Sequence, residues 1–161
     1  MPLDESASYG LVTQTTLSVM DAQEITAILR HRIPDLHEPS KSDICYATTN
    51  RQRAVAAIAP RCDAVVVVGG SNSSNSRRLV EIACDAGCRK AILIERADEL
   101  DALFLNGVAT LGVTSGASTP EVLVTELIEH LSDHFQVSVE EIAIATEEVR
   151  FRLPVTANQS D

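Results

Sequence analysis

The chain has 161 residues, the length of about one ordinary domain. Apolar residues make up 45% and charged residues 22%, which is typical of a globular protein rather than a disordered one. Acidic residues outnumber Lys and Arg by 23 to 13, and a net charge of −10 argues against a nucleic-acid binder, whose affinity depends on cationic contacts to phosphates. No apolar run approaches the roughly 20 residues of a membrane span, and residues 1–8 lack the bases of a signal peptide. We therefore expect a cytoplasmic protein that contacts no membrane.

Scarce aromatic residues, at 3%, indicate a core of Val, Ile, Leu and Ala, as in sheets covered by helices on both faces. In chain order, residues 11–13 are expected to form a strand. A helix follows, opened by a capping box of Asp21 and Glu24 and closed before Pro34. The next helix contains Val55 and Ile58 and is expected to end near residue 60.

The clearest strand is residues 64–68, one Ala and four Val without alternation, which predicts burial on both faces as in a parallel sheet. Later elements follow in order: a polar loop at 71–76, a helix stopped at Gly87, a strand at 91–94, a short helix at 97–105, a strand at 110–113, a polar loop at 114–119, and a helix with Pro120 just inside its start. Strand and helix alternate, so the predicted class is α/β with parallel sheets flanked by helices.

Three polar segments stand at strand-to-helix junctions, at residues 14–18, 71–76 and 114–119. In an open parallel sheet such junctions form the ligand edge, where hydroxyls and free backbone N–H groups hold anions, phosphate especially. The middle segment makes the strongest case, with four Ser and two Asn in six residues. The alternative is ordinary helix capping, for which Ser, Thr and Asn are favoured. Neither a Walker lysine nor a G-x-G-x-x-G pattern supports nucleotide binding by standard means.

Four cysteines without any sign of export favour free thiols over disulfides. Cys45 stands at a junction entering a helix, where the helix dipole favours a thiolate; the alternative is a buried structural cysteine. Cys84 and Cys88 have a spacing that could suit a metal, but no His is near, so small buried side chains are favoured for them and for Cys62. The residues alone thus indicate an acidic α/β protein with an oxyanion or phosphate site and one cysteine of interest.

Four motifs stand along the chain: TQTTLS at 13–18, DICYATTNRQ at 43–52, NSSNS at 72–76 and GVTSGAS at 112–118. In their order and spacing they resemble the 4-hydroxy-3-methylbut-2-enyl diphosphate reductases, iron–sulfur enzymes that end the methylerythritol phosphate route to isoprenoids. The resemblance runs from about Gly10 to Pro154. It implies three α/β domains around a central cluster, of which this chain looks like the last part of the second, residues 1–42, and the complete third, residues 43–153. A frayed tail at 154–161 follows.

The resemblance also implies a site. Cys45 matches one of three cysteines that hold a 4Fe–4S cluster, and Thr15 matches a threonine beside the hydroxymethyl end of the substrate. The groups that bind the substrate diphosphate are matched by Ser73, Ser74, Asn75 and Ser118. An iron left open by the three cysteines would bind the substrate hydroxyl as a Lewis acid, and two electrons with two protons would give isopentenyl and dimethylallyl diphosphate. The implied partners are the diphosphate substrate and an electron donor such as ferredoxin or flavodoxin.

The family's other two cluster cysteines, its diphosphate-binding histidines and its proton-donating glutamate belong to an N-terminal half that lies outside this sequence. One thiolate cannot hold a cluster that needs three protein ligands, so we expect the chain to be inactive alone unless a separate N-terminal half assembles with it. The alternatives are a non-catalytic α/β module that binds phosphorylated metabolites and a marginally folded fragment. If the reductase interpretation is right, all six matched residues should open onto one cavity at the carboxyl edge of the sheets.

Overall fold

The computed structural model describes residue 4 and residues 7–143. A three-stranded parallel sheet in the order β2-β1-β3 lies at its centre, built from β1 (Ala64–Val68), β2 (Ala91–Ile94) and β3 (Leu111–Ser115). The helices are α1 (Val19–Arg32), α2 (Tyr46–Ile58), α3 (Ser74–Asp85) and α4 (Glu121–His134), with short 3-10 helices η1 (Ala59–Arg61) and η2 (Ala97–Glu99). The predicted α/β class and the parallel pairing are confirmed.

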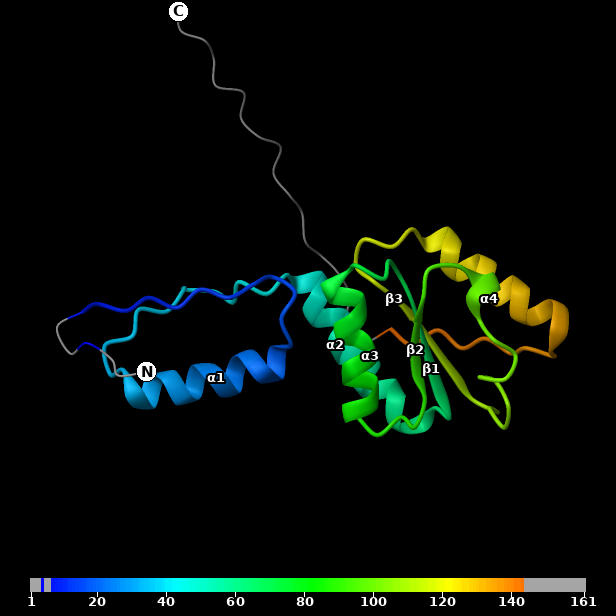
Figure 1. Ribbon diagram of the computed structural model, residues 1–161, viewed down its shortest axis with the longest axis horizontal. Coiled ribbons are helices and arrows are strands. Elements are labelled where there is room, and N and C mark those ends of the chain that lie inside the picture. Colours follow the sequence, from blue (N-terminus) through cyan, green and yellow to red (C-terminus); the bar gives the residue numbers. More distant parts are fainter. Residues whose placement is uncertain (1–3, 5–6, 144–161) are drawn as a thin grey trace, which may run out of the picture.

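Helices cover both faces of the sheet (Figure 1). On one face, Val65 and Val67 of β1 pack with α2 and with Leu79 of α3. On the other face, Val66 and Val68 pack with residues of α4. All five residues of β1 are buried, as the absence of alternation predicted. We call residues 45–134, which contain this sheet and the helices α2, α3 and α4, the α/β unit.

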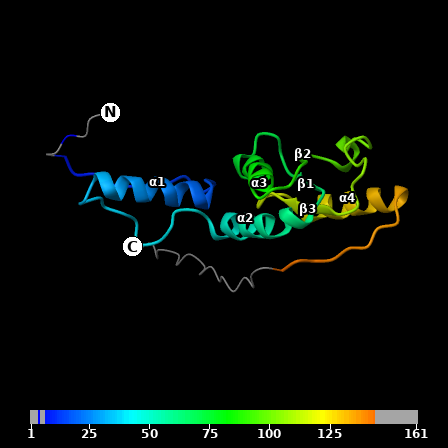
Figure 2. The ribbon, with the colours of Figure 1, turned by 90° about the horizontal axis from the view of Figure 1, so that it is seen from below.

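Residues 7–44 form a separate N-terminal arm that holds α1. Figures 1 and 2 agree that the arm projects beyond the N-terminal end of α2, away from α4. No residue of α1 itself is buried. The arm contains one parallel bridge, between Gly10 and His37, in which the Leu11 N–H donates to the His37 carbonyl at 2.8 Å.

The predicted strand at residues 11–13 is wrong, since pairing stops at this bridge. The Thr13 N–H donates to the Asp43 carboxylate at 2.9 Å instead of extending a ladder. The predicted start of α1 is also wrong. Ser18 is the N-cap, and its Oγ accepts the N–H of Asp21 at 3.1 Å, so the helix begins before the expected capping box. The end before Pro34 is confirmed, because α1 stops at Arg32.

Boundaries inside the α/β unit differ from the expectations by a few residues. Residues 74–76 are the first turn of α3 rather than loop, and residues 114–115 belong to β3. The helix expected at 97–105 shrinks to η2, because the Asp101 side chain accepts the Leu103 N–H at 2.8 Å and favours a turn. Pro120 is the N-cap of α4 rather than its first residue. Gly87, with φ of +100°, ends α3 as predicted.

Within the described ranges, no helix has both the length and the apolar character that crossing a membrane requires. The predicted tail at residues 154–161 and the last part of the proposed 43–153 domain lie outside the described residues.

Candidate functional site

The first turn of α3 lies directly against the carboxyl ends of β1 and β3. Gly69 follows β1 and Gly116 follows β3, and the Gly116 N–H donates to the Val68 carbonyl at 2.9 Å. A Cβ atom on either glycine would collide with the Ser76 hydroxyl. The two glycines therefore let α3 begin in contact with the sheet edge, which is where ligands bind in open parallel sheets.

Ser73 is the N-cap of α3. Its Oγ accepts the Ser76 N–H at 3.2 Å, and the Ser76 hydroxyl donates to the same oxygen at 3.1 Å. Ser73 therefore caps α3, as the alternative predicted, and its contact with an anion stays a prediction. Ser74 is exposed at the first position of the helix, where backbone N–H groups have no partner within the helix.

Asn75 has a different environment from its neighbours in this turn. Its side chain is buried, with 6% exposure, and neither Oδ1 nor Nδ2 has a hydrogen-bond partner among the described residues. A buried amide left without partners costs free energy, so each such group in a folded protein needs an explanation. Capping does not provide one for Asn75, because its side chain bonds to no backbone group of the described residues.

Glu95 holds the start of the Ser71–Ser76 segment. Its carboxylate accepts the Ser71 N–H at 2.7 Å. This hydrogen bond, followed by one from the Ser71 hydroxyl, lowers the pKa of Glu95 below its ordinary value. Because Glu95 follows β2, all three strands contribute to the arrangement of this edge.

Arg51 supplies a cation at the same edge. From α2, its Nη1 donates to the Ser115 hydroxyl at 3.1 Å, and Ser115 is the last residue of β3. Among the described residues, no carboxylate pairs with Arg51. Ser118 is exposed two residues beyond Gly116, in a turn fixed by the Thr119 hydroxyl, which donates to the Val68 carbonyl at 3.2 Å.

Cys45 and Thr15 are neighbours. Cys45 is the exposed N-cap of α2, and its N–H donates to the Thr15 carbonyl at 3.1 Å. Thr15 is exposed as well. The alternative of a buried structural cysteine is therefore wrong for Cys45. At the N-terminus of α2 it is instead accessible to solvent.

The other cysteines differ from one another. Cys88 is buried and its thiol donates to the Lys90 carbonyl at 3.2 Å. Burial raises the pKa of the half-buried Cys62 thiol, and the neighbouring Cys88 adds to this shift. Both therefore fit the structural interpretation, but Cys84 is exposed and does not. The described part of the chain contains no group of three or more His, Cys, Asp or Glu side chains arranged for a metal ion, so it does not by itself fit a 4Fe–4S cluster.

The structure thus brings Thr15 to Cys45, and brings residues 73–75 to the edge where Ser118 follows β3. A pocket of about 500 Å³ lies elsewhere, between α1 and residues 38–44 of the arm, and none of the six matched residues lines it. The convergence of all six on one cavity stays a prediction.

Two residues at this site had no role in the sequence analysis, although both stand in the DICYATTNRQ motif. Arg51 bonds to Ser115, 64 residues away, and the sequence shows no such contact. Gln52 is buried on α2 with Thr48 and Val55. Their spacing of four and three residues places them on one face of the helix, and a polar residue there is the signal that could have indicated a specific partner.

Comparison with known proteins identifies the family. Residues 2–132 match the family model described as LytB protein. The chain is 52% identical over 155 residues to the 4-hydroxy-3-methylbut-2-enyl diphosphate reductase of Ruegeria pomeroyi, covering 96% of this chain and 49% of the relative. It is 48% identical to the reductase of the same name from Gluconobacter oxydans, over 94% of this chain and 45% of that relative.

A solved structure shows the same fold. The E-1-hydroxy-2-methyl-but-2-enyl-4-diphosphate reductase from Plasmodium falciparum is similar with a TM-score of 0.87 and 32% identity, over 96% of this chain and 49% of its own. The chain therefore spans about half the length of the relatives it matches. The expected resemblance and the α/β fold are both confirmed, and the chain belongs to the LytB family.

Proposed function

We propose that this chain is the C-terminal portion of a 4-hydroxy-3-methylbut-2-enyl diphosphate reductase, which converts that substrate to isopentenyl and dimethylallyl diphosphate for isoprenoid synthesis. The names of the matching relatives support the reaction, since the similarity covers nearly all of this chain. The observation that carries the proposal is the buried Asn75 amide, which has no partner among the described residues and stands in the first turn of α3.

In this proposal, the substrate diphosphate binds at the N-terminus of α3. The Asn75 amide and the first backbone N–H groups of α3 donate to phosphate oxygens, as helix N-termini do in other phosphate sites. Ser73, Ser74 and Ser118 add hydroxyl groups. Arg51 adds a positive charge that no described carboxylate neutralises, which offsets the negative net charge of the chain near the anion.

We propose that residues 1–42 complete a second domain together with an N-terminal half, while residues 43–153 form a domain of their own. Exposed apolar side chains on the arm support this division. Val12 is 85% exposed and Met20 is 78% exposed, while Ile25 and Ile28 lie open on α1. Apolar residues gathered on one segment indicate a surface that a partner covers, and the relatives are about twice as long as this chain.

We propose that Cys45 and Thr15 complete a site together with that N-terminal half. The exposed Cys45 thiol would be one of three cysteine ligands of a 4Fe–4S cluster, and the other two would come from the partner. Thr15, held at Cys45 through its carbonyl, would lie at the reacting end of the substrate. Electrons would come from a donor protein such as ferredoxin or flavodoxin. The four free thiols favour a reducing compartment such as the cytoplasm.

Titration of the 161-residue chain with inorganic pyrophosphate by calorimetry tests the anion site. We expect binding, and we expect Asn75→Ala to weaken it about tenfold through the loss of a charge-assisted hydrogen bond. Asn72→Ala removes an exposed amide from the same segment and is the matched control, with unchanged affinity. Absence of pyrophosphate binding, or equal affinity in the Asn75→Ala and Asn72→Ala variants, would contradict the proposal.

Reconstitution of the cluster distinguishes the reductase from the alternative, a non-catalytic module that binds phosphorylated metabolites. We expect no stable cluster absorbance when the chain alone is treated anaerobically with iron and sulfide. Adding the separately produced N-terminal half of a close relative should give a cluster and substrate reduction. If pyrophosphate binds but no cluster forms even with that partner, the chain is a non-catalytic module for phosphorylated ligands.

A further inference from the structure

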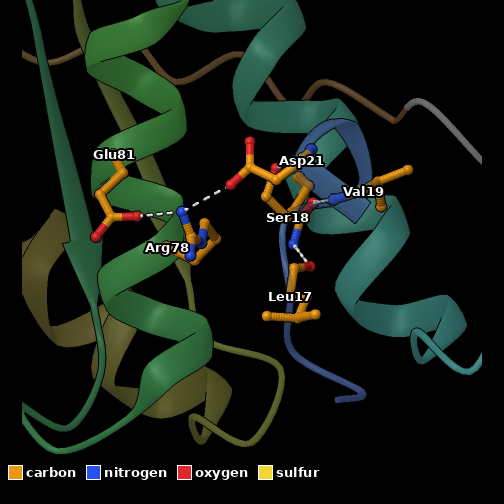
Figure 3. Close-up of polar contacts among 7 residues, drawn as sticks. Leu17, Ser18, Val19, Asp21, Arg78 and Glu81 are labelled. Carbon is orange, nitrogen blue, oxygen red and sulfur yellow. Dashed lines mark hydrogen bonds and ion pairs between the residues drawn. The ribbon is translucent and has the colours of Figure 1, made fainter. Parts of the chain in front are cut away.

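Gln52 of α2 joins the arm to the α/β unit through a pair of hydrogen bonds. Its side chain is 4% exposed. Its Nε2 donates to the Leu17 carbonyl at 2.8 Å, and its Oε1 accepts the Val19 N–H at 2.9 Å. Leu17, Ser18 and Val19 mark the entry to α1 in Figure 3, where the chain passes beside α2. One amide group thus satisfies two backbone groups on either side of the buried Ser18.

The same segment is held a second time by α2. The Cys45 N–H donates to the Thr15 carbonyl at 3.1 Å. Cys45 and Gln52 are seven residues apart, which is about two turns of an α-helix, so they lie on the same side of α2. Residues 15–19 are therefore fastened along one side of α2 at both ends, with the proposed catalytic Thr15 at the end nearest Cys45.

Both contacts require a side chain that donates and accepts at once, as the Gln52 amide does. The Val19 N–H belongs to the first turn of α1 and has no partner inside the helix, so it needs an acceptor. The Leu17 carbonyl needs a donor. A glutamate could accept but, when ionised, could not donate, and a leucine could do neither. Either change would leave a backbone group unpaired in a buried place.

A further link between the arm and the α/β unit, an ion pair between α3 and α1, is weaker. Arg78 of α3 reaches Asp21 of α1 at 3.3 Å and Glu81 of its own helix at 2.6 Å, as Figure 3 shows. The two carboxylates are largely exposed and Arg78 is partly exposed, and such surface ion pairs contribute little stability because water and salt screen them. The Gln52 contacts and the Cys45–Thr15 hydrogen bond therefore hold the 15–19 segment more firmly than this ion pair does.

We propose that Gln52 is a positioning residue, which sets Thr15 against Cys45 without touching the substrate itself. This inference rests on the proposed function for its catalytic consequence, but the contact can be tested without it. Gln52 lies away from the Ser73–Asn75 turn in the hydrogen-bond network, since its side chain bonds to Leu17 and Val19, which both belong to the arm. Its replacement should disturb the reacting end of the site and leave diphosphate binding unchanged.

Hydrogen exchange on the 161-residue chain tests the contact. Gln52→Glu loses the donor to the Leu17 carbonyl but can still accept the Val19 N–H. We expect the segment that carries Thr15 to loosen and the Cys45 amide to exchange about tenfold faster, the effect of losing one net hydrogen bond. Amides of β1 should keep their exchange rates. Gln23→Glu, which makes the same charge change at an exposed site on α1, is the control and should match the unchanged chain. Unchanged exchange at Cys45, or acceleration throughout β1, would overturn the positioning role.

Kinetics of the enzyme assembled with the N-terminal half test whether Gln52 positions Thr15 for catalysis. We expect Gln52→Glu to lower kcat at least about tenfold, since small misplacements of a positioned group have effects of this size. KM and pyrophosphate affinity should stay within about twofold, because the α3 turn is untouched. A rise in KM with unchanged kcat would overturn the inference. If the unchanged assembly shows no turnover, the proposed function fails, and the exchange result alone decides whether Gln52 holds the segment.

Discussion

The arm and the α/β unit both contain a helix that connects two segments paired in parallel, but the two helices differ in what surrounds them. In the α/β unit, α3 connects two parallel strands and buries Leu79 and Ala83 against β1. In the arm, α1 connects Gly10 and His37, which also pair in parallel, yet α1 buries no residue. A helix with a well-formed cap can therefore exist in both places, while a core requires further strands for the helix to cover. The described residues place no further strands beside α1, and its exposed apolar residues are the surface that the proposed N-terminal half would cover.

The largest difference expected between the two regions concerns core truncation. Leu79→Ala removes a fully buried side chain and should lower the free energy of unfolding by about 2–5 kcal/mol. Ile25→Ala removes a similar side chain that is 53% exposed on α1, and the free energy of unfolding should change by less than about 0.5 kcal/mol. Urea denaturation followed by circular dichroism measures both. A loss at Ile25 as large as that at Leu79 would mean that α1 is packed against something in solution.

Replacing a glycine by alanine should also have different effects in the two regions. Gly116→Ala places a methyl group against Ser76 and should cost about 1–3 kcal/mol, because the sheet edge and the first turn of α3 are already in contact. Gly10→Ala in the arm meets no atom closer than 4.0 Å and should be nearly neutral. The double variant Gly116→Ala with Ser76→Gly should recover part of the lost stability, measured by thermal unfolding. Without such recovery, the close approach to Ser76 is not what makes Gly116 necessary.

The same difference between the arm and the α/β unit explains which elements the sequence predicts correctly. The β1 strand and α2 could be predicted because their neighbours are within the chain and their apolar patterns are complete. The strand at residues 11–13 did not form, since an extended segment needs backbone partners along its edge and, among the described residues, pairing stops at the bridge to His37. The α1 start was missed because Asp21 and Ser18 are both favoured caps, and only the geometry chooses between them.

The candidate site was predictable in outline but not in its chemistry. Polar residues at the ends of β1 and β3 indicated an anion site, and Ser73, Ser74 and Asn75 do lie at the N-terminus of α3. That Asn75 alone is buried without a partner depends on side-chain packing, which no pattern of residues expresses. The contact of Arg51 with Ser115 depends on how α2 crosses the sheet edge, and it joins residues far apart in the sequence.

A smaller effect is expected from removing single cations. Arg51→Gln should weaken pyrophosphate binding about three- to tenfold, because an unpaired charge near the anion is lost. Arg30→Gln in the arm should leave the affinity unchanged, since Arg30 is already paired with Glu38 and lies on α1. Arg53→Gln is the control within α2, where the side chain is exposed. Calorimetric titration at low ionic strength measures all three. Equal losses in the three variants would show that only net charge matters and that Arg51 has no special place.

The smallest effects concern two exposed carboxylates, one in each region, whose pKa values are both lowered. The Arg30 side chain lowers the pKa of Glu38, and the Ser71 backbone N–H lowers the pKa of Glu95, in each case from 4.5. Because these folded-state pKa values are depressed, the hydrogen bonds stabilise fully above about pH 4.5 and are lost as the pH falls through the lowered values. Titration of Glu95 and of the Ser71 amide by NMR from about pH 6 to about pH 3 should therefore show a shared midpoint below 4.5.

Added salt should affect the pKa values of Glu38 and Glu95 differently. Added salt should move the Glu38 midpoint back toward 4.5, because its partner is a screened surface cation. The Glu95 midpoint should move less, since a backbone N–H carries no net charge for ions to screen. Glu95→Gln can still accept from Ser71 but cannot titrate, so in that variant the Ser71 amide shift should no longer follow the pH. A Ser71 midpoint at or above 4.5 in the unchanged chain would mean that Glu95 does not hold the start of the Ser71–Ser76 segment, and the order of that segment would then depend on the Ser73 cap alone.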